Sequence, residues 1–157
     1  MSKPAIMQAG DSISAPLGSC FITIGGQRKN FMQAIEVKIT VEKNKSEIPI
    51  MGSAVKGNKS TSMKIKGSAT FHYNTSMFDN PMLEFQNTGK DFYFDMQLTN
   101  EDPTSNVGRR TVIAYGCNLD EWTAATINAD GDYSTGEVSF TVERIEIPEQ
   151  YAELEGM

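Results

Sequence analysis

The sequence predicts a mainly β fold, a small β-barrel or a two-sheet sandwich flanked by one short α-helix. Three observations support this class. Apolar and polar residues alternate over several segments, which is the period of a pleated strand with one buried face. A glycine pair, Gly25-Gly26, and an Asp-Gly step, Asp130-Gly131, mark hairpin turns. One stretch, from Asn80 to Gly89, has helical spacing instead.

The first strands are defined by their turns and their alternation. Residues 20–24 precede Gly25-Gly26, which predicts a strand closed by a hairpin turn. Residues 35–42 alternate strictly, and the same period returns from Met63 to Tyr73. Gly67 falls on the apolar side of that second segment, which indicates a bulge or the close approach of another group.

Later strands are predicted for residues 92–98 and 111–119, and a last one begins near Val138. The last strand changes parity between two apolar groups: Val138, Phe140 and Val142 before the change, Ile145 and Ile147 after it. One extra residue near Glu143 and Arg144 would return both groups to the same face. We therefore expect a β-bulge there.

The predicted helix has the signals of a short surface helix. Asn80 can cap its start, Pro81 suits the first helical position, and Gly89 can end it. Its apolar stripe consists of Phe78, Met82 and Phe85. We expect the helix to pack on a sheet through this stripe.

The length of 157 residues suits one domain with a real core. We expect an N-terminal arm over 1–16, a single β domain over 17–149 and a C-terminal tail over 150–157. Within the domain, residues 43–62 lose the alternation and are expected to form a long polar loop. Loops of that length in a compact domain usually have a function.

The charge argues against a general nucleic-acid binder, because the formal net charge is -6 and such binding relies on excess Lys and Arg. An acidic surface would instead let a polyanion pass without capture. Nine of the 14 basic residues lie between Arg28 and Lys66, whereas residues 120–155 hold ten acids and one base. Opposite ends of one subunit would therefore attract each other.

No catalytic, cofactor or metal constellation emerges from the sequence, so a non-enzymatic protein without a cofactor is expected. Cys20 and Cys117 are far apart and give no metal spacing, and His72 falls on the polar face of its strand. The glycine-rich stretch 52–60 is not followed by the helix that a phosphate loop needs. No secretory signal or membrane-spanning apolar run is present, which predicts a soluble protein made in the cytoplasm.

A family resemblance enters at Val41-Glu-Lys-Asn-Lys-Ser-Glu-Ile-Pro-Ile-Met-Gly52. This segment resembles the tail tube proteins of contractile phage tails, in particular those of defective Bacillus-type prophage particles and phage-tail-like bacteriocins. Further similarity lies in 66–77, 89–98 and 138–149, so the resemblance covers most of the chain from about residue 17 onward.

The resemblance implies rings of six copies that stack into a hollow tube inside a contractile sheath and carry DNA or ions into a target cell. The implied partners are other copies of the chain, the sheath protein, the tape-measure protein and baseplate proteins, with DNA passing but not specifically bound. The implied location is a virion tail or tail-like particle assembled in the bacterial cytoplasm. Sheet edges of neighbouring copies would join around the ring.

Two sets of residues are candidates for assembly and transport. The ring-stacking set belongs to the expected loop: Lys43, Asn44, Lys45, Glu47, Ile48, Ile50, Met51, Lys56 and Lys59. Acids that could line the lumen are Glu36, Asp95, Glu137 and Glu143. Solvation on the outer surface is an equally good reading of each of these acids.

Two other functions stay open from the sequence. One is the tube of a non-contractile tail or of a secretion system, with the same general architecture. The other is a monomeric β module that binds carbohydrate or protein, which would require exposed aromatic side chains on a concave face. Trp122 and Tyr133 are the candidates for such exposed aromatics.

Overall fold

The computed structural model describes residues 6–156. Its elements, in chain order, are a 3-10 turn (Ala9–Asp11), β1 (Gly18–Ile24), β2 (Gln27–Asn30), β3 (Ala34–Ile48), β4 (Gly57–His72), α1 (Asp79–Thr88), β5 (Phe94–Glu101), β6 (Arg109–Trp122), β7 (Thr135–Val142) and β8 (Arg144–Glu149). Every strand pairing is antiparallel. The predicted class, mainly β with one short helix, is confirmed, and each predicted strand segment coincides largely with an observed strand.

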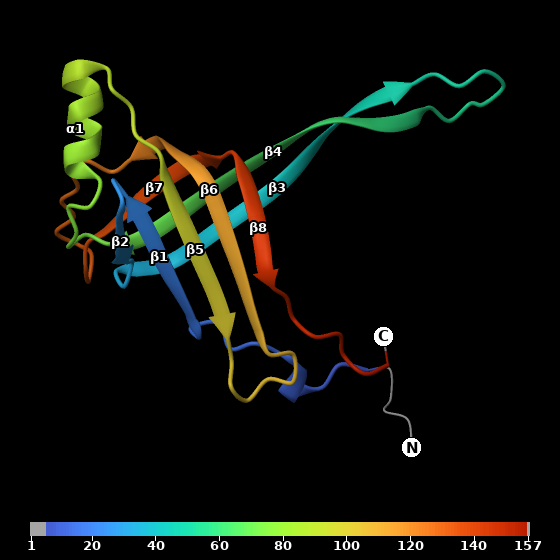
Figure 1. Cartoon of the computed structure of the whole chain (residues 1–157), viewed down its shortest axis with the longest axis horizontal. Coiled ribbons are helices and arrows are strands. Elements are labelled where there is room, and N and C mark those ends of the chain that lie inside the picture. The colour runs from blue at the N-terminus through green and yellow to red at the C-terminus, as the bar shows by residue number, and fades with distance from the viewer. Residues whose placement is uncertain (1–5, 157) are drawn as a thin grey trace.

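The strands form a sandwich-like arrangement and not a closed barrel. Their order is β2-β1-β5-β6-β7-β4-β3, with β8 also paired to β6. Strand β6 belongs to both layers, because residues 109–117 pair with β5 and residues 118–122 pair with β7. The front layer is therefore β2-β1-β5-β6-β8 and the back layer is β6-β7-β4-β3 (Figure 1).

The bend in β6 depends on Gly116. Its φ of 65° lies in the left-handed region that favours glycine, and its N–H donates to an Asp95 carboxylate oxygen at 3.2 Å. Register shifts lie near this point in the pairings of β6 with β5 and with β7. The glycine thus lets one strand turn from the front layer into the back layer.

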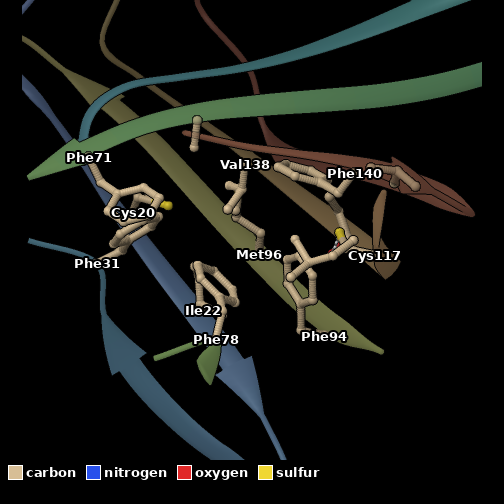
Figure 2. Close-up of a cluster of buried hydrophobic side chains, with 14 of the residues drawn as sticks. Cys20, Ile22, Phe31, Phe71, Phe78, Phe94, Met96, Cys117, Val138 and Phe140 are labelled. Atoms are coloured by element: carbon tan, nitrogen blue, oxygen red, sulfur yellow. Dashed lines mark hydrogen bonds between the residues drawn. The ribbon is translucent and has the colours of Figure 1, made fainter. Parts of the chain in front are cut away.

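The core lies between the layers and is rich in aromatic rings (Figure 2). Five buried phenylalanines, Phe31, Phe71, Phe78, Phe94 and Phe140, form a continuous series of tilted or edge contacts with centroids 5.6–6.3 Å apart. Ile22, Met96 and Cys117 are also fully buried. Such ring pairs add to the hydrophobic stabilisation that burial provides.

The parity change in the last strand has a structural cause. Strand β7 ends at Val142 and β8 begins at Arg144, with Glu143 between them. The Glu143 N–H donates to the Tyr115 carbonyl at 3.0 Å, and Ile145 contacts the core as expected. The predicted interruption is present, but its form differs from a bulge within one strand, because here the chain passes from the back layer to the front layer.

Helix α1 is confirmed, with corrections at its start and along its stripe. It begins at Asp79, so Phe78 and not Asn80 occupies the cap position, without a side-chain cap. Gly89 ends it with φ 75°, and its N–H donates to the Phe85 carbonyl at 2.9 Å. Phe78 is buried and Met82 contacts the core, but Phe85 is exposed.

The expected loop 43–62 is wrong, because these residues form the outer part of a long β-hairpin. The pairing of β3 with β4 continues to Ile48 and Gly57, which leaves only 49–56 as the tip. The pairing of β4 with β7 ends at Ile65, so the hairpin continues beyond the sandwich as a projecting arm (Figure 1). We call residues 43–62 the arm.

The segments next to the domain contact the turn between β5 and β6. The Ser14 N–H donates to Asp102 at 3.1 Å, and the Asn106 side chain donates to Asp11 at 2.9 Å. On the C-terminal side, the Ala152 N–H donates to the Val107 carbonyl at 2.8 Å. In the part of the chain from 6 to 156, no helix is long and apolar enough to cross a bilayer.

Candidate assembly surfaces

The arm brings the whole predicted ring-stacking set together. Lys43, Asn44, Lys45, Glu47 and Ile48 lie in β3, Ile50, Met51 and Lys56 lie in the tip, and Lys59 lies in β4. All nine are exposed. Four lysines and one glutamate give the arm an excess of positive charge.

Backbone pairing and local side-chain bonds keep the arm in one shape. The Asn44 side chain donates to the Ser62 hydroxyl at 2.9 Å, and the Thr61 hydroxyl donates to the Asn44 carbonyl at 3.2 Å. At the tip, the Ser53 N–H donates to the Ile50 carbonyl, and Gly52 has the positive φ that such a turn requires. The exposed ion pair Lys56–Glu47, at 3.7 Å, adds little.

The tip, together with Ile48 at the adjoining end of β3, presents aliphatic and thioether side chains to solvent. The exposed fractions are 40% for Ile48, 52% for Ile50, 100% for Met51 and 76% for Val55. Sequence reasoning missed Val55, because an apolar residue in an apparent loop has no neighbours that define a face. Such an exposed apolar cluster on a protruding element is typical of an interaction site.

Two of the four predicted lumen acids lie together on the outer face of the back layer. Thr70 is the register partner of both Glu36 on β3 and Glu137 on β7. The next rows of this face are Lys38, Ser68, Ser139 and Glu121, then Thr40, Lys66, Thr141 and Asn118. These rows are polar throughout, with small hydroxyl side chains in each.

Asp95 and Glu143 are not part of that face. Both adjoin Gly116 at the bend of β6, where Asp95 accepts its N–H and the Glu143 carboxylate lies where a side chain at position 116 would start. The structure therefore divides the predicted lumen acids into two pairs on different parts of the molecule.

The outer face of the front layer has a different character. Arg28 lies over the Phe21 ring at 4.4 Å, and Arg144 lies over the Tyr115 ring at 4.2 Å. Arg144 also donates to Glu146 at 2.6 Å and, with the Tyr115 hydroxyl, holds the pKa of that carboxyl below its usual range. Arg144 is thus paired with an acid, and both arginines lie over aromatic rings of this face.

Strand edges that lack a partner among the described strands include β2, the outer edge of β3, the outer edge of β8 and, in the arm, the edge of β4 over residues 57–64. Unpaired N–H and C=O groups on such edges favour the addition of another strand. No group of three or more His, Cys, Asp or Glu side chains within 6–156 is placed to hold a metal ion. The exposed features of the molecule are therefore edges, an arm and a polar sheet face.

Comparison with known families identifies the chain. The family model described as phage tail tube protein matches residues 5–149. The chain belongs to the phage tail tube protein family. Family members are structural components of a virion or tail-like particle.

Curated relatives of this tail tube protein come from Bacillus subtilis strain 168. The phage-like element PBSX protein XkdM is 33% identical over 147 residues, 94% of this chain and 97% of its own length. The uncharacterized protein YqbM is 35% identical over 144 residues, 92% of this chain and 95% of its own length. These matches confirm the resemblance to defective Bacillus-type prophage proteins.

The fold recurs in a tail-like particle. A chain in the six-fold symmetrised cryo-EM structure of the anti-feeding prophage baseplate has a TM-score of 0.63 and 9% sequence identity. The similarity covers 94% of this tail tube protein and 97% of that chain. At this identity the match shows a common fold.

Proposed function

We propose that six copies of this chain join edge to edge into a ring, and that rings stack into the hollow tube of a contractile tail or tail-like particle. The tube encloses a channel for DNA or ions and lies inside a sheath. It catalyses nothing. The particle is assembled in the bacterial cytoplasm, where the tube also contacts the tape-measure and baseplate proteins.

The observation that carries this proposal is the projecting arm. Strand β4 pairs with β7 only from Ile65 onward, so its residues 57–64 project beyond the sandwich. At ~3.3 Å per residue this projecting part of the strand is about 26 Å long. A paired hairpin of this length with an exposed apolar tip adds nothing to the core of its own subunit. Contact with another copy would bury that tip.

Ring closure is assigned to the open sheet edges. The outer edge of β3 is free along the back layer, and the outer edge of β8 is free on the front layer. Joining such edges between copies satisfies backbone groups that would otherwise need water. Two different edges in contact make a heterologous interface, which closes into a ring when the rotation allows.

The channel wall is assigned to the outer face of the back layer, with Glu36 and Glu137 in the lumen. The three rows from Glu36 to Asn118 consist of Ser, Thr, Lys, Glu and Asn side chains, and the ring contact of His72 with Tyr133 lies beyond them at one end of the face. The acids would repel phosphate groups over the Debye length of about 8–10 Å. Together these features favour passage without retention.

Shortening the arm tests the proposal. Residues 46–60 are replaced by Asn-Gly, which suits a two-residue hairpin loop between the remaining strands. The variant is expected to keep its unfolding temperature within a few degrees, because the arm lies outside the core, and to form no stacked tubes. Negative-stain microscopy and sedimentation measure the assembly.

The matched control is Ile127→Ser, which removes a fully exposed apolar side chain away from the arm. Its tubes should resemble those of the unmodified chain. Tubes of normal length from the shortened-arm variant would contradict the stacking role. Single rings from that variant, with tubes from the control, are the expected pair of results.

A further inference from the structure

The outer face of the front layer carries arginine and no lysine, and we call it the front face. Its rows are Arg28, Thr23 and Asp95; Asn30, Phe21, Gln97, Ile113 and Glu146; Ser19, Thr99, Thr111 and Glu149; Tyr115 and Arg144; and Glu101 and Arg109. Three of the four arginines of the chain thus lie on the front face, whereas no lysine of residues 6–156 lies in these rows. The outer face of the back layer is the reverse within the same residues, because Lys38 and Lys66 lie there without an arginine.

Arginine and lysine contribute differently to a protein surface. The guanidinium is planar, weakly hydrated and able to stack on aromatic rings, whereas the ammonium of lysine is a compact and strongly hydrated charge. Interfaces between proteins are accordingly enriched in arginine and aromatic residues and depleted in lysine. The front face combines its arginines with Phe21 and Tyr115, so its composition is that of a protein interface. The lysines of the back layer suit a wall that stays hydrated.

Arg28 is the arginine of the front face whose charge is not paired within the described part of the chain. Arg144 donates to Glu146 and Arg109 donates to Glu149, whereas no hydrogen bond or ion pair joins Arg28 to another of residues 6–156. Arg28 is exposed and its guanidinium lies over the Phe21 ring at 4.4 Å. Because the ring already holds the guanidinium in one position, little side-chain freedom is lost when an acceptor from another chain binds it.

A depression of about 210 Å³ adjoins Arg28 on this face. Its lining includes Phe21, Ile113 and Tyr115, together with Gln97 in the row between the first two. All four side chains are half-buried in the single chain, so part of each ring and of the isoleucine still contacts solvent. An apolar side chain from a partner would remove this remaining apolar surface from water, which stabilises a complex.

We propose that the front face docks the sheath protein, through a segment that places a carboxylate at Arg28 and an apolar side chain in the adjoining depression. This inference rests on the proposed function and names the surface through which the tube and its sheath meet. The charge that Arg28 offers requires an acid on the partner, and the half-buried rings beside it require an apolar neighbour for that acid. Salt would weaken the first contact while leaving the second in place.

The position of the front face in the sandwich selects this partner over a second copy of the chain. The outer faces of two packed layers point in opposite directions (Figure 1), so a channel wall on the back layer turns the front face away from the channel. Neighbours in a ring that join through sheet edges leave both outer faces uncovered. The front face is therefore open to a protein that surrounds the tube.

Charge reversal in the full-length chain tests the docking. Tubes of Arg28→Glu are mixed with the sheath protein encoded with this chain, and the sheath protein that sediments with them is measured against its concentration. Lys29→Glu is the matched control, because it makes the same change in net charge on the same strand. Lys29 is the register partner of the buried Ile22, whereas Arg28 is that of Thr23, so the two side chains lie on opposite sides of β2.

Both variants should form tubes and melt at the temperature of the unmodified chain, because both side chains are exposed. Arg28→Glu should bind the sheath protein at least about thirtyfold more weakly, the size of effect that a central interface residue has when it is lost. Lys29→Glu should bind it as the unmodified chain does. A second measurement uses phenylglyoxal, which modifies accessible guanidinium groups: Arg28 should react in bare tubes and be protected in tubes covered by sheath, as mass spectrometry of peptides would show.

Equal binding of sheath protein by Arg28→Glu and Lys29→Glu would overturn the docking assignment and leave the proposed function standing. Protection of Arg28 in bare tubes, or folded Arg28→Glu that forms no tubes, would place the front face between copies of the chain and overturn the assignment as well. Absence of any ring or tube from the unmodified chain would overturn the proposed function itself, and the assignment with it.

Discussion

Gly67→Ala tests the closest approach in the sandwich. Gly67 lies in β4, and a Cβ built on it would meet two ring carbons of Phe140 below 2.5 Å and the Lys38 carbonyl oxygen at 3.2 Å. Phe140 is 1% exposed and contacts the Phe94 ring at a centroid distance of 5.6 Å. The glycine therefore makes room for an aromatic ring that has nowhere to move.

The expected cost follows from that geometry. Carbon atoms in contact prefer about 3.5–4.0 Å, so the ring or the strand would have to shift by more than 1 Å. Overpacking of this kind typically costs about 1–3 kcal/mol, and pairing of β4 on both sides favours the upper end. Alanine recovers roughly 0.5–1 kcal/mol by restricting the unfolded chain. A net loss of about 2 kcal/mol lowers Tm by roughly 4–8 °C for a domain of this size.

Thermal unfolding and urea titration of Gly67→Ala measure the loss. Gly131→Ala is the matched control, because its nearest neighbour atom would be at 3.5 Å, an ordinary contact. Adding Phe140→Leu to Gly67→Ala should restore part of the loss, and the double-mutant cycle gives the coupling. A melting temperature of Gly67→Ala equal to that of the control would refute the reasoning.

Three further predictions concern titratable groups. Hydrogen bonds from the Thr104 hydroxyl and the Ser14 and Thr104 N–H groups lower the pKa of Asp102, so their stabilising effect is present above its unfolded pKa and lost as pH falls through the folded value. NMR should show the Ser14 amide released in acid, and already at neutral pH in Asp102→Ala, which has no side-chain acceptor. Burial raises the pKa of Cys20 and Cys117 to about 12, so neither thiol should react with a disulfide reagent at pH 8 until the protein unfolds; rapid labelling of the native protein would contradict this. The double variant Glu36→Lys/Glu137→Lys should form tubes that retain single-stranded DNA at low salt, measured by co-sedimentation. Equal release of DNA by the variant tubes and the unmodified tubes would place these acids outside the channel.

The sequence predicts strands best where one face is buried. Residues 35–42 and the segment containing Gly67 alternate because one side of each meets the core. The turn at Gly25-Gly26 was also predictable, since both residues need the positive φ values of 59° and 79° that the structure shows. The parity change at Glu143 identified the passage between layers, although not its form.

The arm could not be predicted as strands from periodicity. Both of its faces are exposed, so residues 43–62 have no reason to alternate, and they appear as a polar loop. Backbone pairing that continues from the core-facing part of β3 holds them extended. The resemblance at residues 41–52 nevertheless identified this segment as the one to consider for assembly.

The arrangement of the candidate acids depends on topology, which local patterns do not contain. Glu36 and Glu137 share a row only because β4 lies between β3 and β7. Asp95 and Glu143 have the same polar parity in the sequence, yet they adjoin the bend at Gly116. The position of β4 determines the first outcome and the bend of β6 the second, and neither can be deduced from one strand at a time.

Electron microscopy of the purified full-length chain, together with sedimentation at increasing concentration, tests the central claim most directly. Self-association through strand edges and the arm predicts six-fold rings that stack into tubes. A chain that remains a monomer at millimolar concentration would contradict it.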